Sequence, residues 1–95
     1  MKGRYLIKYT CSPHTTWITE QQGIVLIHTR DNRSAQLGYP EAAVWDLITR
    51  NWPQKKLIRI LAVIAEMDNE AAELLLDNCL KKWADQGWLI RTSQQ

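Results

Sequence analysis

Two cysteines and two histidines carry the most versatile side-chain chemistry in this sequence. Cys11 and His14 stand in the segment Cys-Ser-Pro-His, whereas His28 and Cys79 are isolated along the chain. Thiolate and imidazole groups are the usual ligands of structural zinc, but a closed site needs four of them. The Cys-x-x-His segment supplies only two, and Cys79 falls on the apolar face of a predicted helix, where a buried structural thiol is the usual state. We therefore predict no metal site.

Enzymatic catalysis is also not indicated by the residues present. A covalent mechanism needs a nucleophile, a base and a group that orients the base. His14 lies beside Pro13 in a predicted loop and His28 lies on a predicted strand, so no such trio emerges. The sequence has no glycine-rich phosphate loop and no pair of acids at a strand end. We predict a protein that is not an enzyme and that needs no cofactor.

The composition is that of one folded domain spanning residues 1–95. Apolar residues make up 45% of the chain and charged residues 23%, and the net charge is +2, which is ordinary for a globular protein. Two cysteines far apart in sequence suit a reducing compartment. The N-terminus has no signal-peptide pattern, and the longest apolar-rich run, from Leu57 to Ala65, is too short to cross a bilayer. These features predict a cytoplasmic protein.

The first forty residues show the two-residue periodicity of strands. β-branched and aromatic residues at Thr15–Thr19 and Ile24–Thr29 predict two strands, joined by a polar turn that ends at Gly23. A turn at 31–33 leads to a shorter and more polar third strand, Ser34–Leu37, which suits the edge of a sheet. Residues 1–12 are predicted to form an arm or an extra strand.

From Pro40 the periodicity changes to 3.6 and predicts three helices. Pro40 and Pro53 each fit the first turn of a helix, and the first helix is expected to end near Trp52 because residue 53 is a proline. Asp68 is a predicted N-cap of the third helix, and Gly87 is its predicted stop. The chain should fray over residues 91–95, which leaves a core of about residues 15–90. The predicted fold is α+β and winged-helix-like, a three-stranded antiparallel sheet followed by three helices.

The edge strand is the strongest candidate for a binding site. An edge presents unpaired N–H and C=O groups to which an extended peptide can add as another strand. Ser34–Leu37 contains no proline, so all its N–H donors are intact. The alternative is that residues 5–9 of the same chain already cover this edge. The sequence alone leaves both arrangements open.

Nucleic-acid binding is the alternative function, since winged helices commonly place their third helix in the major groove. Four acidic residues and two lysines lie on the exposed side of the predicted third helix: Glu70, Glu73, Asp77, Asp85, Lys81 and Lys82. Such a helix repels phosphate, so we consider binding to nucleic acid unfavourable. The second helix has an unusually wide apolar surface, which predicts contact with a partner protein or with a second copy, that is, a homodimer.

The order and spacing of these segments resemble the PqqD-like family. The resemblance rests on a hairpin that ends in Leu37, on the helix start Tyr39-Pro40-Glu41-Ala42-Ala43, and on the closing pattern Leu76-x-x-Cys79-Leu80-x-x-Trp83-x-x-x-Gly87-Trp88-Leu89-Ile90. The turns at 38–41 and 50–53 depart from the usual family pattern, so the pathway that the protein serves stays open. The resemblance covers about residues 15–90.

The resemblance implies a recognition element for ribosomally made, post-translationally modified peptides. In this interpretation the leader segment of a precursor docks as a strand beside the edge, against the third helix. A modifying enzyme, in this family often of the radical S-adenosylmethionine type, binds elsewhere and receives the tethered peptide, while the domain acts as a peptide chaperone without membrane contact. The implied site comprises the edge residues Arg33, Ser34, Ala35, Gln36 and Leu37, the helix floor Leu76, Leu80 and Ala84, and the rim residues Asp77 and Lys81.

Overall fold

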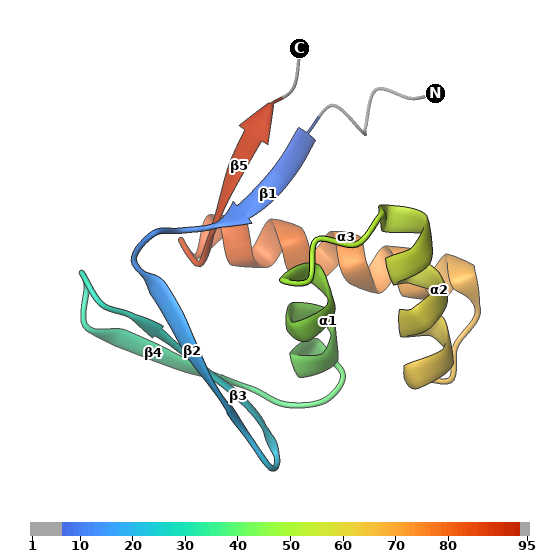
Figure 1. The fold of residues 1–95 in the computed structure, drawn as a ribbon, viewed down its shortest axis with the longest axis horizontal. Coiled ribbons are helices and arrows are strands. Elements are labelled where there is room, and N and C mark those ends of the chain that lie inside the picture. Colours follow the sequence, from blue (N-terminus) through green and yellow to red (C-terminus); the bar gives the residue numbers. More distant parts are fainter. Residues whose placement is uncertain (1–6, 94–95) are drawn as a thin grey trace.

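The computed structural model describes residues 7–93 of the chain. Three strands are followed by three helices, and one further strand stands at each end of this series (Figure 1). The elements are β1 (Ile7–Cys11), β2 (Thr15–Glu20), β3 (Gly23–His28), β4 (Arg33–Leu37), α1 (Glu41–Ile48), α2 (Gln54–Ile64), α3 (Asn69–Asp85) and β5 (Leu89–Ser93).

β2, β3 and β4 form a three-stranded antiparallel sheet with β3 in the centre. The burial of β3 alternates, with Ile24, Leu26 and His28 buried and the residues between them half-buried. This alternation is expected for a sheet with one face against a core and the other towards solvent. The predicted α+β fold, with its three-stranded sheet followed by three helices, is confirmed.

β1 and β5 pair with each other in a separate antiparallel ribbon (Figure 1). Ile7 lies opposite Ser93, and Cys11 lies opposite Leu89. The prediction that the chain frays from Arg91 is therefore wrong for residues 91–93, because the N-terminal strand supplies their hydrogen-bond partners. Residues 1–12 were expected to form an arm or an extra strand, and residues 7–11 form the strand. Residues 1–6 and 94–95 lie outside the described part of the chain.

The helices begin where the sequence predicts, but two of them end earlier. Pro40 and Pro53 immediately precede α1 and α2. α1 ends at Ile48, and the chain then turns through Asn51, whose φ of 59° lies in the left-handed region that asparagine tolerates. Trp52, expected at the end of this helix, consequently lies in the connection. Met67 likewise lies beyond α2, which ends at Ile64.

One apolar core joins β3 to the three helices. Trp45 of α1 and Trp83 of α3 are almost completely buried, and their rings meet edge to face with centroids 5.2 Å apart. The ring of Trp17 of β2 also meets the Trp45 ring edge to face, with centroids 5.5 Å apart. These aromatic pairs fix the sheet and two of the helices relative to one another. No helix within residues 7–93 is both long and apolar enough to cross a membrane.

The start of α3 depends on one side chain. The Asp68 carboxylate accepts a hydrogen bond of 2.8 Å from the backbone N–H of Ala71, as the predicted N-cap requires. We expect Asp68→Ala to lower the free energy of unfolding by about 1 kcal/mol, because the N–H loses its partner. Urea unfolding measures this change. Asp68→Asn keeps an oxygen in place and serves as the control; an equal loss in both variants would contradict the capping role.

Candidate peptide-binding site

β4 is an edge strand with one side unpaired. It pairs only with β3, and no other segment within residues 7–93 pairs with its outer side. The alternative that residues 5–9 cover this edge is wrong for residues 7–9, because these residues pair with β5. Residues 5 and 6 lie outside the described part of the chain. Among residues 7–93, the backbone groups on the outer side of β4 therefore have no partner strand.

The direction of each backbone group follows from the turn between β2 and β3. Only residues 21 and 22 separate these strands, and Glu20 lies opposite Gly23. A two-residue turn is closed by a hydrogen-bonded pair, so the backbone groups of the odd-numbered residues of β3 face β2 and those of the even-numbered residues face β4. Two hydrogen bonds agree with this alternation: the N–H of Thr29 donates to the carbonyl of His14, and the carbonyl of His28 accepts from Asn32 in the turn to β4.

The register of β4 then identifies the outward groups. Ile24, Leu26 and His28 lie opposite Leu37, Ala35 and Arg33, respectively. The backbone N–H and C=O groups of Arg33, Ala35 and Leu37 therefore form hydrogen bonds with β3. The N–H and C=O groups of Ser34 and Gln36 consequently point away from the sheet, at the spacing with which a further strand would pair.

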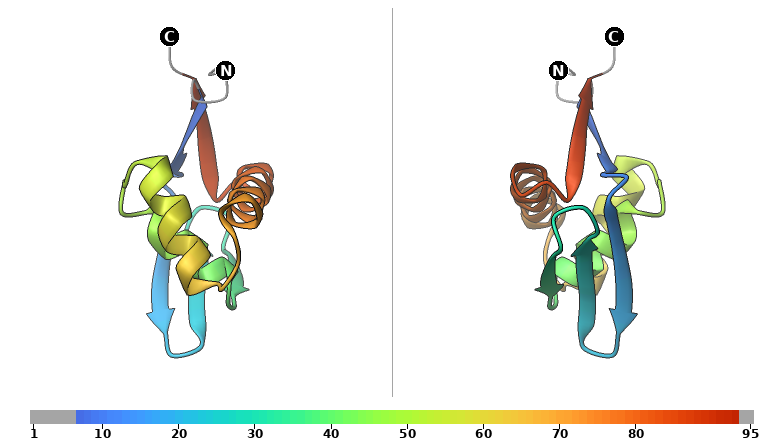
Figure 2. Two further views of the ribbon diagram at one scale, coloured as in Figure 1. Left: turned by 90° about the vertical axis from the view of Figure 1, so that its right-hand side faces the viewer. Right: turned by 90° about the vertical axis from the view of Figure 1, so that its left-hand side faces the viewer.

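β2 is the other edge of the sheet, but its surroundings differ. In both views of Figure 2, β4 lies on the side of the molecule that carries α3, whereas β2 lies on the side of α2. A contact at the end of α3 confirms this neighbourhood: the guanidinium carbon of Arg33 lies 4.9 Å from the centre of the Trp88 ring. A strand added to β4 would therefore lie on the side of the molecule that carries α3.

Arg33 is held in place at the start of β4. Its Nε lies 3.5 Å from a carboxylate oxygen of Asp31, and its guanidinium group stacks on Trp88. Trp88 is 2% exposed and meets the ring of buried His28 edge to face at 5.9 Å. The sequence predicted Arg33 as a site residue but gave no signal for its partner, because Trp88 follows it by more than fifty positions.

The predicted α3 residues divide by exposure. Leu76 is only 2% exposed and belongs to the core, and Leu37 at the end of β4 is also buried. Leu80, Ala84 and Asp77 are half-buried, while Lys81 is exposed. Of the three predicted floor residues, Leu80 and Ala84 are thus partly accessible, whereas Leu76 belongs to the core beneath them.

The histidine, cysteine and acidic side chains of residues 7–93 determine whether the described part of the chain offers a metal site or a reactive thiol. Within residues 7–93 no three His, Cys, Asp or Glu side chains lie close enough together to hold a metal ion. Burial, together with the nearby carboxylate of Glu41, raises the pKa of the Cys79 thiol to about 11, and burial also raises the pKa of Cys11. Since the thiolate is the reactive form, both cysteines are poor nucleophiles at neutral pH.

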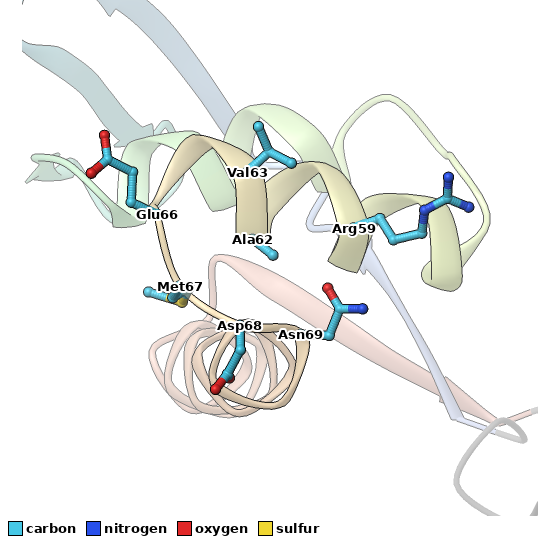
Figure 3. A pocket seen from close by; sticks show the side chains of 7 residues that line it. All are labelled: Arg59, Ala62, Val63, Glu66, Met67, Asp68 and Asn69. Carbon is cyan, nitrogen blue, oxygen red and sulfur yellow. The ribbon is translucent and has the colours of Figure 1, made fainter.

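A hollow of about 560 Å³ lies away from this edge, between α2 and the start of α3 (Figure 3).

Two solved structures share this fold. One is described as lasso peptide synthetase B1 complexed with the leader peptide; its TM-score is 0.78 at 16% identity, covering 86% of this chain and 96% of that one. The other is TbiB1 in complex with the TbiA(β) leader peptide, with a TM-score of 0.77 at 16% identity and coverage of 85% and 94%. No protein-family model and no curated protein matches the chain. The fold that the PqqD-like resemblance implies is confirmed.

The raised pKa of Cys79 predicts a loss of stability at alkaline pH. The unfolded chain ionises this thiol near pH 9, whereas the folded protein holds the neutral thiol up to about pH 11. Stability from this difference is complete below pH 9 and is lost as the pH rises towards 11, because ionisation then favours the unfolded state. We expect the free energy of unfolding to fall less steeply over this range in Cys79→Ala, as urea titrations at each pH would show. Equal slopes would contradict the assignment.

Proposed function

We propose that this domain binds the leader segment of a ribosomally made precursor peptide as an additional strand on β4 and presents the precursor to a modifying enzyme. The observation that carries this proposal is the unpaired edge of β4, where the register directs the N–H and C=O groups of Ser34 and Gln36 outward, on the side of the molecule that carries α3. The two proteins with the same fold are described in complex with leader peptides, which supports this use of the fold.

Backbone pairing would give the complex its register. A hydrogen bond between neutral groups contributes about 1 kcal/mol net, and Ser34 and Gln36 together offer two donors and two acceptors. This pairing is independent of sequence, so it suits a leader that binds as an extended chain. The flexible precursor loses conformational entropy when it docks, which keeps the affinity moderate.

Side chains on α3 would choose among leaders. Leu80 and Ala84 form a shallow apolar strip that accepts alternate side chains of the added strand. Asp77 and Lys81 stand one turn apart on the same helix and carry opposite charges, so the leader residue that lies beside each is selected by its charge. The site of this proposal keeps all the predicted edge residues, with Leu76 and Leu37 in supporting positions.

The domain would act by tethering and not by catalysis. Binding the leader holds the rest of the precursor at a high effective concentration near an enzyme bound to another surface. The modifying enzyme is predicted to be of the radical S-adenosylmethionine type, and the similar structure that belongs to a lasso peptide synthetase supports a synthetase as a second class of partner.

Nucleic-acid binding stays the alternative prediction, and the charges of α3 oppose it. Glu70, Asp85 and Lys82 are exposed and Asp77 is half-buried, so acidic groups dominate the helix that would enter the groove. Retention on heparin or DNA at moderate salt would favour this alternative over peptide binding.

Gln36→Pro tests the docking edge directly. Proline removes an outward N–H and places its ring where the added strand would lie. We expect the affinity for the leader to fall about tenfold or more, measured by calorimetry with synthetic leader peptides from short reading frames encoded beside this gene.

Gln36→Ala is the matched control, because it removes the same side chain and keeps the N–H. Circular dichroism establishes that both variants are folded. Unchanged binding by a folded Gln36→Pro variant would exclude this edge as the docking site.

Lys81→Glu tests selection by charge. The variant should bind acidic leader peptides more weakly and basic ones more tightly, while its stability changes by no more than about 0.5 kcal/mol because the residue is exposed. Lys82→Glu makes the same charge change at the neighbouring exposed position, which points in another direction from the helix axis. Equal shifts in peptide preference for both variants would show that only net charge matters.

A further inference from the structure

The outer face of α2 carries charges of opposite sign at its two ends. Lys55, Lys56 and Arg59 occupy exposed positions in the first half of the helix, and Glu66 lies two residues beyond its end. Val63 lies between these ends and is 78% exposed. Figure 3 shows Arg59 and Glu66 extending from opposite ends of this segment, with Val63 between them. We call this surface the α2 face.

The charges of the α2 face are placed against the preference of the helix itself. α2 has no acidic residue in its first turn and no basic residue in its last turn. Lysines near the N-terminus and a carboxylate near the C-terminus oppose the helix dipole. Within residues 7–93, no ion pair joins any of these basic groups or Glu66 to another residue. Lys56 has a partner among these residues, since its Nζ lies 4.7 Å from the centre of the Trp52 ring, whereas Lys55, Arg59 and Glu66 form no ion pair there.

Glu66 occupies a backbone position that favours glycine. The N–H of Glu66 donates to the carbonyl of Val63, and the N–H of Met67 donates to the carbonyl of Ala62, which is the hydrogen-bond pattern of a Schellman motif. Glu66 itself has a φ of 55°, in the left-handed region. Glycine would relieve this strain, so the carboxylate is present at a cost to the monomer.

We propose that the α2 face binds the α2 face of a second copy of this chain, with the two helices antiparallel about a twofold axis. Such an axis brings the basic end of one helix to the acidic end of the other, which relieves both unfavourable dipole contacts. With the axis between Ala62 and Val63, Arg59 lies opposite Glu66 of the second copy.

The hollow beside α2 supplies the shape for this contact. It is lined by the apolar side chains of Ala62, Val63 and Met67 and by the polar side chains of Arg59, Glu66, Asp68 and Asn69 (Figure 3). In a twofold dimer each hollow can accept the exposed Val63 of the other copy. In Figure 2, α2 lies on the side of the molecule that carries β2, and β4 lies on the other side. The proposed contact therefore leaves both β4 edges accessible and does not depend on the proposed function.

Charge reversal in pairs tests this arrangement. Sedimentation equilibrium of the full chain should show a monomer–dimer equilibrium that weakens with salt. Arg59→Glu and Glu66→Arg should each weaken dimerisation about tenfold or more, because symmetry makes every reversal act at two contacts. The double variant Arg59→Glu/Glu66→Arg exchanges the charges and should restore most of the affinity.

Glu66→Gly separates this proposal from a role in folding. The variant should be more stable than the original chain at low concentration, where it is monomeric, and yet dimerise more weakly. Lys82→Glu, on α3, is the control and should leave the dimer unchanged. A chain that stays monomeric at high concentration and low salt would overturn the proposal and leave this face to another protein, as would a double variant that fails to recover.

Discussion

The row of backbone groups along β3 is the constraint on which the site depends. β3 has a neighbour on each side, so all its N–H and C=O groups are paired within the sheet. Once the two-residue turn to β2 fixes which groups face that strand, the alternation of the chain fixes the rest. The backbone groups of Arg33, Ala35 and Leu37 pair with β3. The register of the sheet therefore determines which backbone groups of β4 point towards solvent. The outward groups of Ser34 and Gln36 are therefore a consequence of a turn some fifteen residues away in sequence.

An edge strand that binds a peptide needs a fixed position as well as unpaired backbone groups. Arg33 provides it, because its guanidinium group stacks on Trp88 and lies close to Asp31. Trp88 in turn follows directly after the left-handed Gly87, where the N–H of Trp88 closes the end of α3 by donating to the carbonyl of Trp83. The Arg33–Trp88 contact thus joins β4 to the end of α3 at one end of the proposed site. The distance between the strand and the helix is therefore fixed before the peptide binds.

Local signals in the sequence were sufficient for most of the fold. Pro40, Pro53 and Asp68 mark helix starts through backbone chemistry that needs no distant partner, and the three predicted strands are the strands of the central sheet. The pairing of β1 with β5 joins residues about eighty positions apart, and no short turn connects the two strands in sequence. For the site, the edge was predictable from the weak side-chain content of residues 34–37. Periodicity placed Leu76 and Leu80 on one apolar face, but only packing decides that Leu76 is in the core and Leu80 at the rim.

The wide apolar surface predicted for the second helix separates into two roles. Leu57 and Leu61 are buried against the core, whereas Val63 remains exposed between charges of opposite sign. Periodicity alone cannot make this distinction, since it reports hydrophobicity and not what covers it. Figure 2 shows α2 on the side of the molecule that carries β2, with β4 on the other side. A domain that presents a tethered peptide needs such separation, because a surface shared by the leader and by another protein would force the two to compete for it.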